Sequence, residues 1–113
     1  MGYGKIPRIV EYTPASVIYL LKQKDILERL AEQGDTTASD ILMDLDSIMK
    51  NVKVTARQQS CMDLAWYQGY NYREAAKLLS ITPQGVYFNL KLVTNKIAKQ
   101  LDGRRKNERI RKV

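Results

Sequence analysis

Residues 71–90 read NYREAAKLLSITPQGVYFNL, and the spacing of their apolar side chains decides the fold. They predict a short helix, a tight turn and a second helix that opens at Thr82 and Pro83, because threonine caps helices and proline suits the first turn. The apolar side chains expected to lock the two helices together are Ala75, Ala76, Leu79, Ile81, Val86 and Leu90. This pattern is typical of a helix-turn-helix, which places its second helix in the major groove of duplex DNA.

The side chains left on the outer face of the second helix are candidate DNA contacts. Gln84 has the amide that pairs with adenine, and Tyr87 or Phe88 offers an apolar surface to the thymine methyl group. Gly85 would let the backbone approach the DNA. Free N–H groups at the helix start and neighbouring polar or cationic side chains are expected to bind phosphates. The predicted DNA-binding residues are Arg73, Thr82, Pro83, Gln84, Gly85, Tyr87, Phe88, Lys91, Arg104 and Arg105.

The alternative is a packed helical hairpin that binds no DNA, with Tyr87 and Phe88 in its core. Two adjacent aromatic residues cannot both face a core that already takes Val86 and Leu90. At least one of them is therefore expected on the surface. Phe88 could alternatively pack against the N-terminal helices or against a second subunit.

Positive charge gathers in the second half of the chain, whose net charge over 113 residues is +7. Residues 1–51 hold 6 basic and 8 acidic side chains, residues 52–101 hold 7 and 2, and residues 102–113 hold 6 and 2. Such a field steers a polyanion to the helix-turn-helix and the tail. The tail either follows phosphates beside the groove or only increases solubility.

Composition argues against catalytic and metal-dependent functions. The chain has no histidine and one cysteine, Cys61, so it lacks the usual zinc sites and the Ser-His and Cys-His nucleophile pairs. Asp40, Asp44 and Asp46 are not set in a glycine-punctuated loop of the calcium-binding type. No enzyme activity, cofactor or metal is expected. A single cysteine fits a bacterial cytoplasm, and no apolar run approaches the roughly 20 residues of a membrane span.

The pattern predicts an all-α protein of five helices. Residues 1–12 are read as an N-terminal arm, residues 13–52 as two amphipathic helices, residues 53–101 as the DNA-binding domain and residues 102–113 as a basic flexible tail.

Local signals place the ends of these helices. The first helix is predicted from its cap at Thr13 to Gly34, and Thr36 or Thr37 is expected to cap the second. Two capping boxes open the third and fourth helices, one formed by Thr55 with Gln58 and a looser one by Asn71 with Glu74. The fifth helix is expected to run from Pro83 to about Leu101, where Asp102 and Gly103 break the pattern.

Residues 54–101 resemble region 4 of bacterial sigma factors and the region-4-type proteins of phages and mobile elements. The matching features are the T-x-x-Q opening, the aromatic-Gln-Gly before the turn, the Y-R-E-A-A segment and V-x-x-x-L in a long last helix. Ser80 stands where the family usually has glycine with a positive φ angle. Residues 83–85 lack the Arg and Glu pairs that many sigma factors use at the −35 element, so promoter specificity does not carry over.

The resemblance implies a small transcription regulator of phage or mobile-element origin that binds duplex DNA and contacts RNA polymerase. The acidic N-terminal helices are candidates for that protein contact, although a solvated face around a core stripe is the favoured explanation. The stripe of the second helix could instead form a homodimer through residues 13–52; its members are Ile41, Leu45, Ile48 and Val52. The rival functions are a phage terminase small subunit and an interaction module that grips RNA polymerase without touching DNA.

Overall fold

The computed structural model describes the backbone of residues 12–111 and the side chains of residues 12–103. The first eleven residues of the predicted N-terminal arm therefore lie outside the described residues. Residues 12–111 form six α-helices and one π-helical segment, and contain no strand. The elements are α1 (Pro14–Lys22), α2 (Lys24–Glu32), α3 (Thr36–Lys50), α4 (Ala56–Met62), the π-helix η2 (Asp63–Tyr67), α5 (Tyr72–Leu79) and α6 (Pro83–Arg111).

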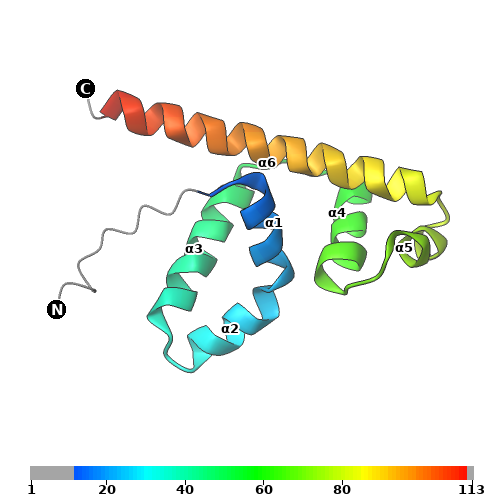
Figure 1. The fold of residues 1–113 in the computed structure, drawn as a ribbon, viewed down its shortest axis with the longest axis horizontal. Helices are drawn as coiled ribbons and strands as arrows, with labels where there is room; N and C mark the ends of the chain where they lie inside the picture. The colour runs from blue at the N-terminus through cyan, green and yellow to red at the C-terminus, as the bar shows by residue number, and fades with distance from the viewer. Residues whose placement is uncertain (1–11, 112–113) are drawn as a thin grey trace.

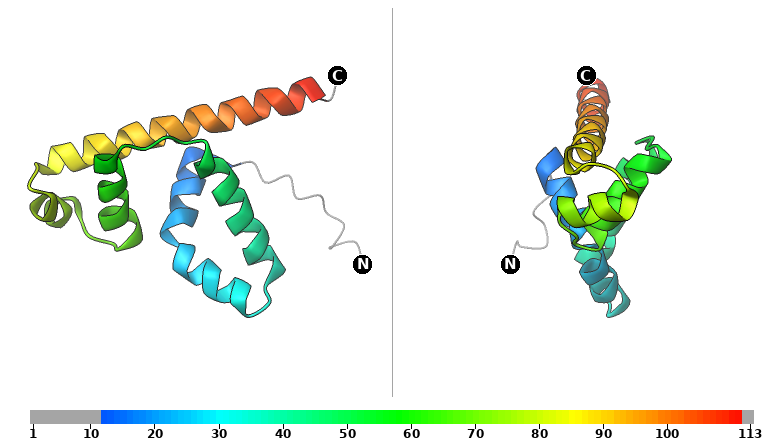
Figure 2. Two further views of the ribbon diagram at one scale, coloured as in Figure 1. Left: turned by 180° about the vertical axis from the view of Figure 1, so that it is seen from behind. Right: turned by 90° about the vertical axis from the view of Figure 1, so that its right-hand side faces the viewer.

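Helix α6 forms the spine of the molecule, and the other helices lie on one side of it (Figure 1). It packs against α1, α3, α4 and α5. The two groups of helices that it joins, α1–α3 and α4–α5, lie side by side along its length in the left view of Figure 2. All of the residues that α6 sends into the core are buried, and they are Val86, Leu90, Val93, Ile97 and Leu101.

Local capping signals explain most helix starts, as the sequence predicts. Thr13 forms a capping box with Ser16 at the start of α1. The two predicted capping boxes are confirmed at α4 and α5: each first side chain accepts from the backbone of the third helical residue, whose side chain accepts in return. The cap of α3 is Asp35 and not Thr36 or Thr37, because the Asp35 carboxylate accepts the Ala38 N–H at 3.0 Å.

The prediction of one helix between Thr13 and Gly34 is wrong, because the chain breaks at Gln23 into α1 and α2. Gln23 has φ −97° and ψ 12°, and its N–H bonds the Leu20 carbonyl in a tightened turn. The apolar stripe is interrupted here by the exposed Lys24. The break lets Leu27 point into the same core as Leu21, so the correct count is six α-helices.

The third predicted helix ends in a wide π turn. In η2 the Gln68 N–H reaches the Asp63 carbonyl, five residues back, at 3.0 Å. A straight α-helix cannot turn Cys61 and Trp66 toward one face together with Leu64 and Ala65. The π turn contains one extra residue, and this rotates the end of the helix. As a result Cys61 and Trp66 are buried, and Leu64 and Ala65 are partly buried.

Helix α6 runs past the predicted break at Asp102 and Gly103 and ends at Arg111. The tail of residues 102–113 was expected to be flexible, but its backbone is helical through residue 111. A mid-helix glycine costs only about 1 kcal/mol, and most of the residues around Gly103 are good helix formers. The side chains after Gly103 lie outside the described part of the chain.

A polar contact fastens the connector between α3 and α4 to the spine. The Lys96 ammonium donates to the Lys53 carbonyl at 2.6 Å and to Gln58 Oε1 at 2.9 Å. Gln58 is 5% exposed, and the same oxygen also accepts the Thr55 N–H. Lys96 therefore holds the start of α4 against α6. Within residues 12–111 no helix has the length and apolar character needed to cross a membrane.

Candidate nucleic-acid interface

The turn between α5 and α6 has the backbone of a helix-turn-helix. Ser80 adopts the left-handed conformation, with φ 58° and ψ 43°, and the Ile81 N–H bonds back to the Ala76 carbonyl at 3.0 Å. The positive φ that the family usually gives to glycine is thus imposed on a serine. Ala75 and Ala76 are buried, and their small side chains let α6 pass close to α5.

The first turn of α6 is closed by Thr82. Its hydroxyl accepts the Gly85 N–H at 3.0 Å, and its carbonyl accepts the Val86 N–H at 3.2 Å. Pro83 has no N–H. Among the described residues this leaves two N–H groups at the helix start without an acceptor, those of Thr82 and Gln84, to meet the phosphates that the sequence predicts there.

Two opposite stripes divide the surface of α6. Val86, Leu90, Val93 and Ile97 form the buried stripe. Shifting each of these positions by two residues gives the exposed stripe, because two residues correspond to a rotation of about 200° on a helix. We call this the outer stripe, and its members are Gln84, Phe88, Lys91 and Asn95.

The structure places most of the predicted DNA contacts on the surface at or near this stripe. Tyr87 is 51% exposed and Phe88 is 59% exposed, so neither belongs to the core. The remaining exposed members of the prediction are Arg73, Thr82, Pro83, Gln84 and Lys91. Arg104 and Arg105 lie on the C-terminal part of α6, and the positions of their side chains are outside the described residues.

Gly85 has an intramolecular reason for lacking a side chain, which differs from the predicted close approach to DNA. A Cβ atom built on Gly85 would lie 3.3 Å from the Thr82 hydroxyl oxygen and 3.6 Å from Ile81 Cδ1. This direction points into the capped turn. The glycine therefore leaves room for the Thr82 cap.

An aromatic pair joins the two helices of the motif on its exposed side. The ring centroids of Tyr72 and Tyr87 lie 6.1 Å apart with an interplanar angle of 57°. Tyr72 is the first residue of α5 and is itself about two-fifths exposed. Tyr87 is thus held on the side of α6 that faces α5, while Phe88 points away from both helices.

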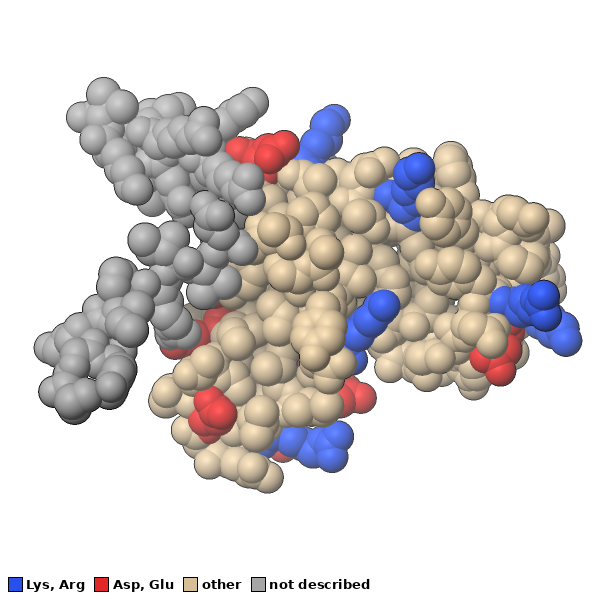
Figure 3. All heavy atoms as spheres, viewed as in Figure 1, with Lys and Arg blue, Asp and Glu red and all other residues tan. Residues whose placement is uncertain are grey.

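Figure 3 shows basic side chains along α6 and at the α5 end of the molecule, while most of the acidic side chains on this face, together with further basic ones, lie over α2 and α3. Lys91 is exposed on the outer stripe, and Arg73 and Lys77 are exposed on α5. Lys96 is different, because its ammonium group donates its two hydrogen bonds to the Lys53 carbonyl in the connector and to Gln58 in α4. Between residues 83 and 103, the exposed lysines of α6 that are free to meet a polyanion are therefore Lys91, on the outer stripe, and Lys99.

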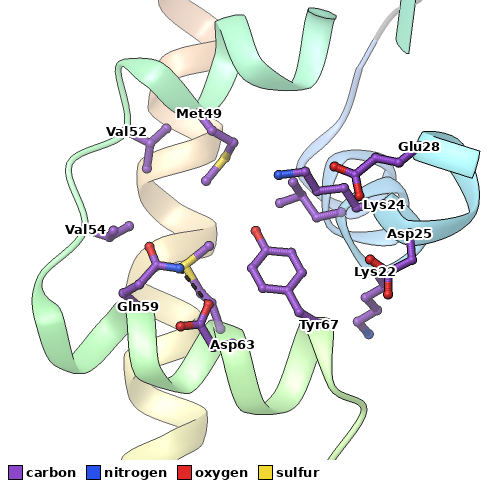
Figure 4. A pocket seen from close by; sticks show the side chains of 12 residues that line it. Lys22, Lys24, Asp25, Glu28, Met49, Val52, Val54, Gln59, Asp63 and Tyr67 are labelled. Atoms are coloured by element: carbon purple, nitrogen blue, oxygen red, sulfur yellow. Dashed lines mark hydrogen bonds between the residues drawn. The ribbon is translucent and has the colours of Figure 1, made fainter. Parts of the chain in front are cut away.

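A pocket of about 490 Å³ lies between the N-terminal helices and α4–η2 (Figure 4). Met49, Val52 and Val54 line one side of it, and the Tyr67 ring points into it from η2. Burial, and then the nearby Asp63 carboxylate, raises the pKa of Tyr67. None of the predicted DNA contacts up to Lys91 lines this pocket.

Cys61 is a buried free thiol next to this region. Burial raises its pKa, and the nearby Arg57 offsets that effect only in part. A high pKa keeps the sulfur protonated and unreactive at neutral pH. Cys61 therefore acts as a core side chain, as its place on the apolar face of the helix predicts.

The apolar stripe of α3 is used inside the monomer. Leu45, Ile48 and Val52 are buried, and Ile41 is partly buried against the same core. Leu45, Ile48 and Val52 are therefore unavailable to a second subunit, whereas Ile41 is covered only in part. This corrects the expectation that the whole stripe forms a homodimer contact. A dimer through residues 13–52 would need other side chains.

Sequence reasoning missed two surface residues of this region, Tyr72 and Asn95. Asn95 carried a usable signal, because it continues the spacing of Gln84, Phe88 and Lys91 by one more turn. Tyr72 could not be found in this way, since its importance comes from a contact with Tyr87 across the turn.

A family model described as ECF sigma factor matches residues 21–103, which span α2 to α6 as well as the end of α1. The match covers the helix-turn-helix and most of the N-terminal helices. No curated protein and no solved structure matches the chain. The buried stripes, the left-handed turn and the family match together lead to one conclusion: the chain belongs to the ECF sigma factor family.

Proposed function

We propose that this protein is a transcription regulator that binds specific sequences in duplex DNA by placing the N-terminal half of α6 in the major groove. The observation that carries the proposal is the outer stripe, where Gln84 and Phe88 are exposed directly opposite the buried Val86 and Leu90. Side chains in the first turns of a recognition helix are the ones that meet base edges. An exposed phenylalanine in this position has no partner within the described monomer.

Phosphate contacts would come from the edges of the same motif. Arg73 and Lys91 supply exposed positive charge, and the Gln84 N–H at the helix start has no acceptor among the described residues. Arg104 and Arg105 would extend the contact along the DNA backbone from the far end of α6. Such contacts orient the protein and make its affinity depend on salt, but they do not read sequence.

Membership of the sigma factor family favours transcription over DNA packaging, so the terminase reading becomes the weaker alternative. The same membership supports a contact with RNA polymerase, for which the acidic surface of α2 and α3 is the proposed site. We place the protein in the bacterial cytoplasm, where both partners occur. Its phage or mobile-element origin remains a prediction from the sequence.

The test begins with selection of duplexes from a random pool by the purified protein, followed by affinity measurements between 50 and 200 mM salt. With five to eight phosphates neutralised, affinity should fall by about three to four orders of magnitude over this range. Recovery of no preferred sequence, together with a flat salt response, would favour the interaction module that binds protein only.

Two double variants distinguish positive charge on the helix-turn-helix from positive charge elsewhere on the protein. Arg73→Ala with Lys91→Ala should reduce the slope of log affinity against log salt by about 2, because each lost phosphate contact removes about 0.9. Arg29→Ala with Lys50→Ala removes the same charge from exposed positions on α2 and α3. This control should leave the slope nearly unchanged, and an equal effect of both pairs would contradict the proposed docking face.

A further inference from the structure

The side chains on the exposed side of α6 carry a narrow range of chemistry. The amide of Gln84 matches the donor and acceptor that adenine presents in the major groove, and the rings of Tyr87 and Phe88 match the thymine methyl group. Between residues 83 and 101 the chain has no arginine, which is the commonest reader of guanine. It also has no carboxylate there to accept a hydrogen bond from cytosine.

Lys91 is the one outer-stripe side chain that could reach guanine. It lies eight residues after Pro83, about 12 Å along the helix axis, and therefore beyond the first two turns. The turns that meet base edges thus offer an amide and two aromatic rings. These groups select A·T pairs and give no favourable contact that is specific to G·C pairs.

The position of the Tyr87 ring is set by a neighbour on α5. Tyr72 contacts it at a centroid distance of 6.1 Å, within the range of favourable tilted aromatic pairs. Tyr72 is in turn fixed at the start of α5 by the capping box, in which Asn71 and Glu74 exchange hydrogen bonds of 2.9 and 3.1 Å. An exposed ring held in this way presents the same edge to each DNA site.

We infer that α6 selects A·T-rich major-groove sequences through thymine methyl groups, which Tyr87 and Phe88 contact, and that Tyr72 is a positioning residue for Tyr87. The inference rests on the proposed function and deepens it by naming the class of DNA sequence. The alternative is recognition of guanine by charged side chains, but the first two turns of α6 contain no arginine or lysine that could make this contact.

Replacing thymine by deoxyuridine tests the inference, because it removes one methyl group and leaves base pairing intact. On a duplex selected by the wild-type protein, each thymine is replaced singly and affinity is measured by fluorescence anisotropy. Loss of one buried methyl contact should weaken binding about four-fold, from about 0.8 kcal/mol. One or two thymines should show this loss, and the others should not.

Variants assign each sensitive thymine to a side chain. Phe88→Ala should weaken binding to the thymine duplex and abolish the deoxyuridine effect at one position. Lys91→Ala should weaken binding while the effect persists at every sensitive position. All these residues are exposed, and a thermal melt of each variant checks that the fold is intact.

A matched set of variants tests the role of Tyr72. Tyr72→Ala should remove the deoxyuridine effect at the thymine assigned to Tyr87, whereas Tyr72→Phe should retain it, because the observed contact is between rings. Tyr19→Ala removes another exposed tyrosine, from α1, and should change nothing. An effect of Tyr72→Ala that is uniform at all positions would overturn the positioning role.

The outcomes separate this inference from the proposed function. If the protein selects duplexes but these are G·C-rich, or if every deoxyuridine substitution stays within two-fold, the inference is overturned and DNA binding stands. If no duplex is selected and binding is insensitive to salt, the proposed function fails and the inference fails with it. Selection of A·T-rich duplexes with a deoxyuridine effect that depends on Phe88 supports both.

Discussion

Replacement of Lys96 by methionine tests how the connector between α3 and α4 is held to the spine. The substitution keeps a long aliphatic side chain and removes the hydrogen bonds of 2.6 and 2.9 Å to the Lys53 carbonyl and Gln58 Oε1. Hydrogen bonds to a charged group contribute about 1.5–3 kcal/mol each when well shielded. Lys96 is only half-buried, and water competes at the Lys53 carbonyl, so this figure must be reduced.

Gln58 limits the loss further, because its oxygen keeps the Thr55 N–H as a donor at 3.0 Å. We therefore expect Lys96→Met to lower the free energy of unfolding by about 1–2 kcal/mol and Tm by roughly 5–10 °C. Urea denaturation followed by helical circular dichroism measures this difference, provided that the m-value is unchanged.

Lys99→Met is the matched control, since Lys99 is an exposed lysine on the same helix with no hydrogen bond to other described residues. It should change stability by less than 0.5 kcal/mol, as is usual for a surface substitution. Equal effects of the two substitutions would refute the assigned role of Lys96. Reduced DNA affinity in a folded Lys96→Met protein would also count against its placement away from the interface.

Three further predictions concern the turn, the thiol and the C-terminal segment. Ser80→Gly should raise the free energy of unfolding by about 0.5–1 kcal/mol in urea denaturation, because glycine adopts the positive φ of 58° without strain, and destabilisation would contradict the left-handed turn. The raised pKa of the buried Cys61 lowers its thiolate fraction at any given pH; its reaction with a disulfide reagent at pH 8 should be at least ten-fold slower in native protein than in urea, and equal rates would show an accessible thiol. Deletion of residues 104–113 should reduce the salt dependence of DNA binding, and an unchanged slope would show that this segment binds no phosphates.

Features that depend on neighbouring residues were predictable from the sequence. The capping boxes at Thr55 and Asn71 are complete within four residues, and the structure forms both of them. The buried stripe of α6 follows from helical spacing alone: Val86 and Leu90 were correctly predicted to face inward, and the buried Val93 and Ile97 continue the same spacing. The exposure of Gln84, Tyr87 and Phe88 then follows by elimination.

Features that depend on competition between local and distant contacts were not predictable. Glutamine is not a residue type that marks a helix break, so the sequence gives no sign of the break at Gln23. The break appears because Leu21 and Leu27 must reach one core. At Gly103 a helix end was predicted where the helix continues, because the surrounding helix formers outweigh the cost of one glycine. The π turn of η2 and the Lys96 contact both need partners that only the folded chain brings near.

The same distinction holds for the candidate interface. Its outer stripe could be read from periodicity, and Asn95 was missed only because the pattern was not continued for another turn. The pairing of Tyr72 with Tyr87 depends on how α5 crosses α6, which no local pattern specifies. The role of Gly85 needed the position of the Thr82 hydroxyl.

The central claim is that the outer stripe of α6 meets duplex DNA. Mapping amide chemical shifts of the isotope-labelled protein during titration with a selected duplex tests it most directly. The account predicts the largest changes at Gln84, Phe88 and Lys91 and at the start of α5, with little change in α2 and α3. Changes confined to α2 and α3, with those three residues unaffected, would contradict it.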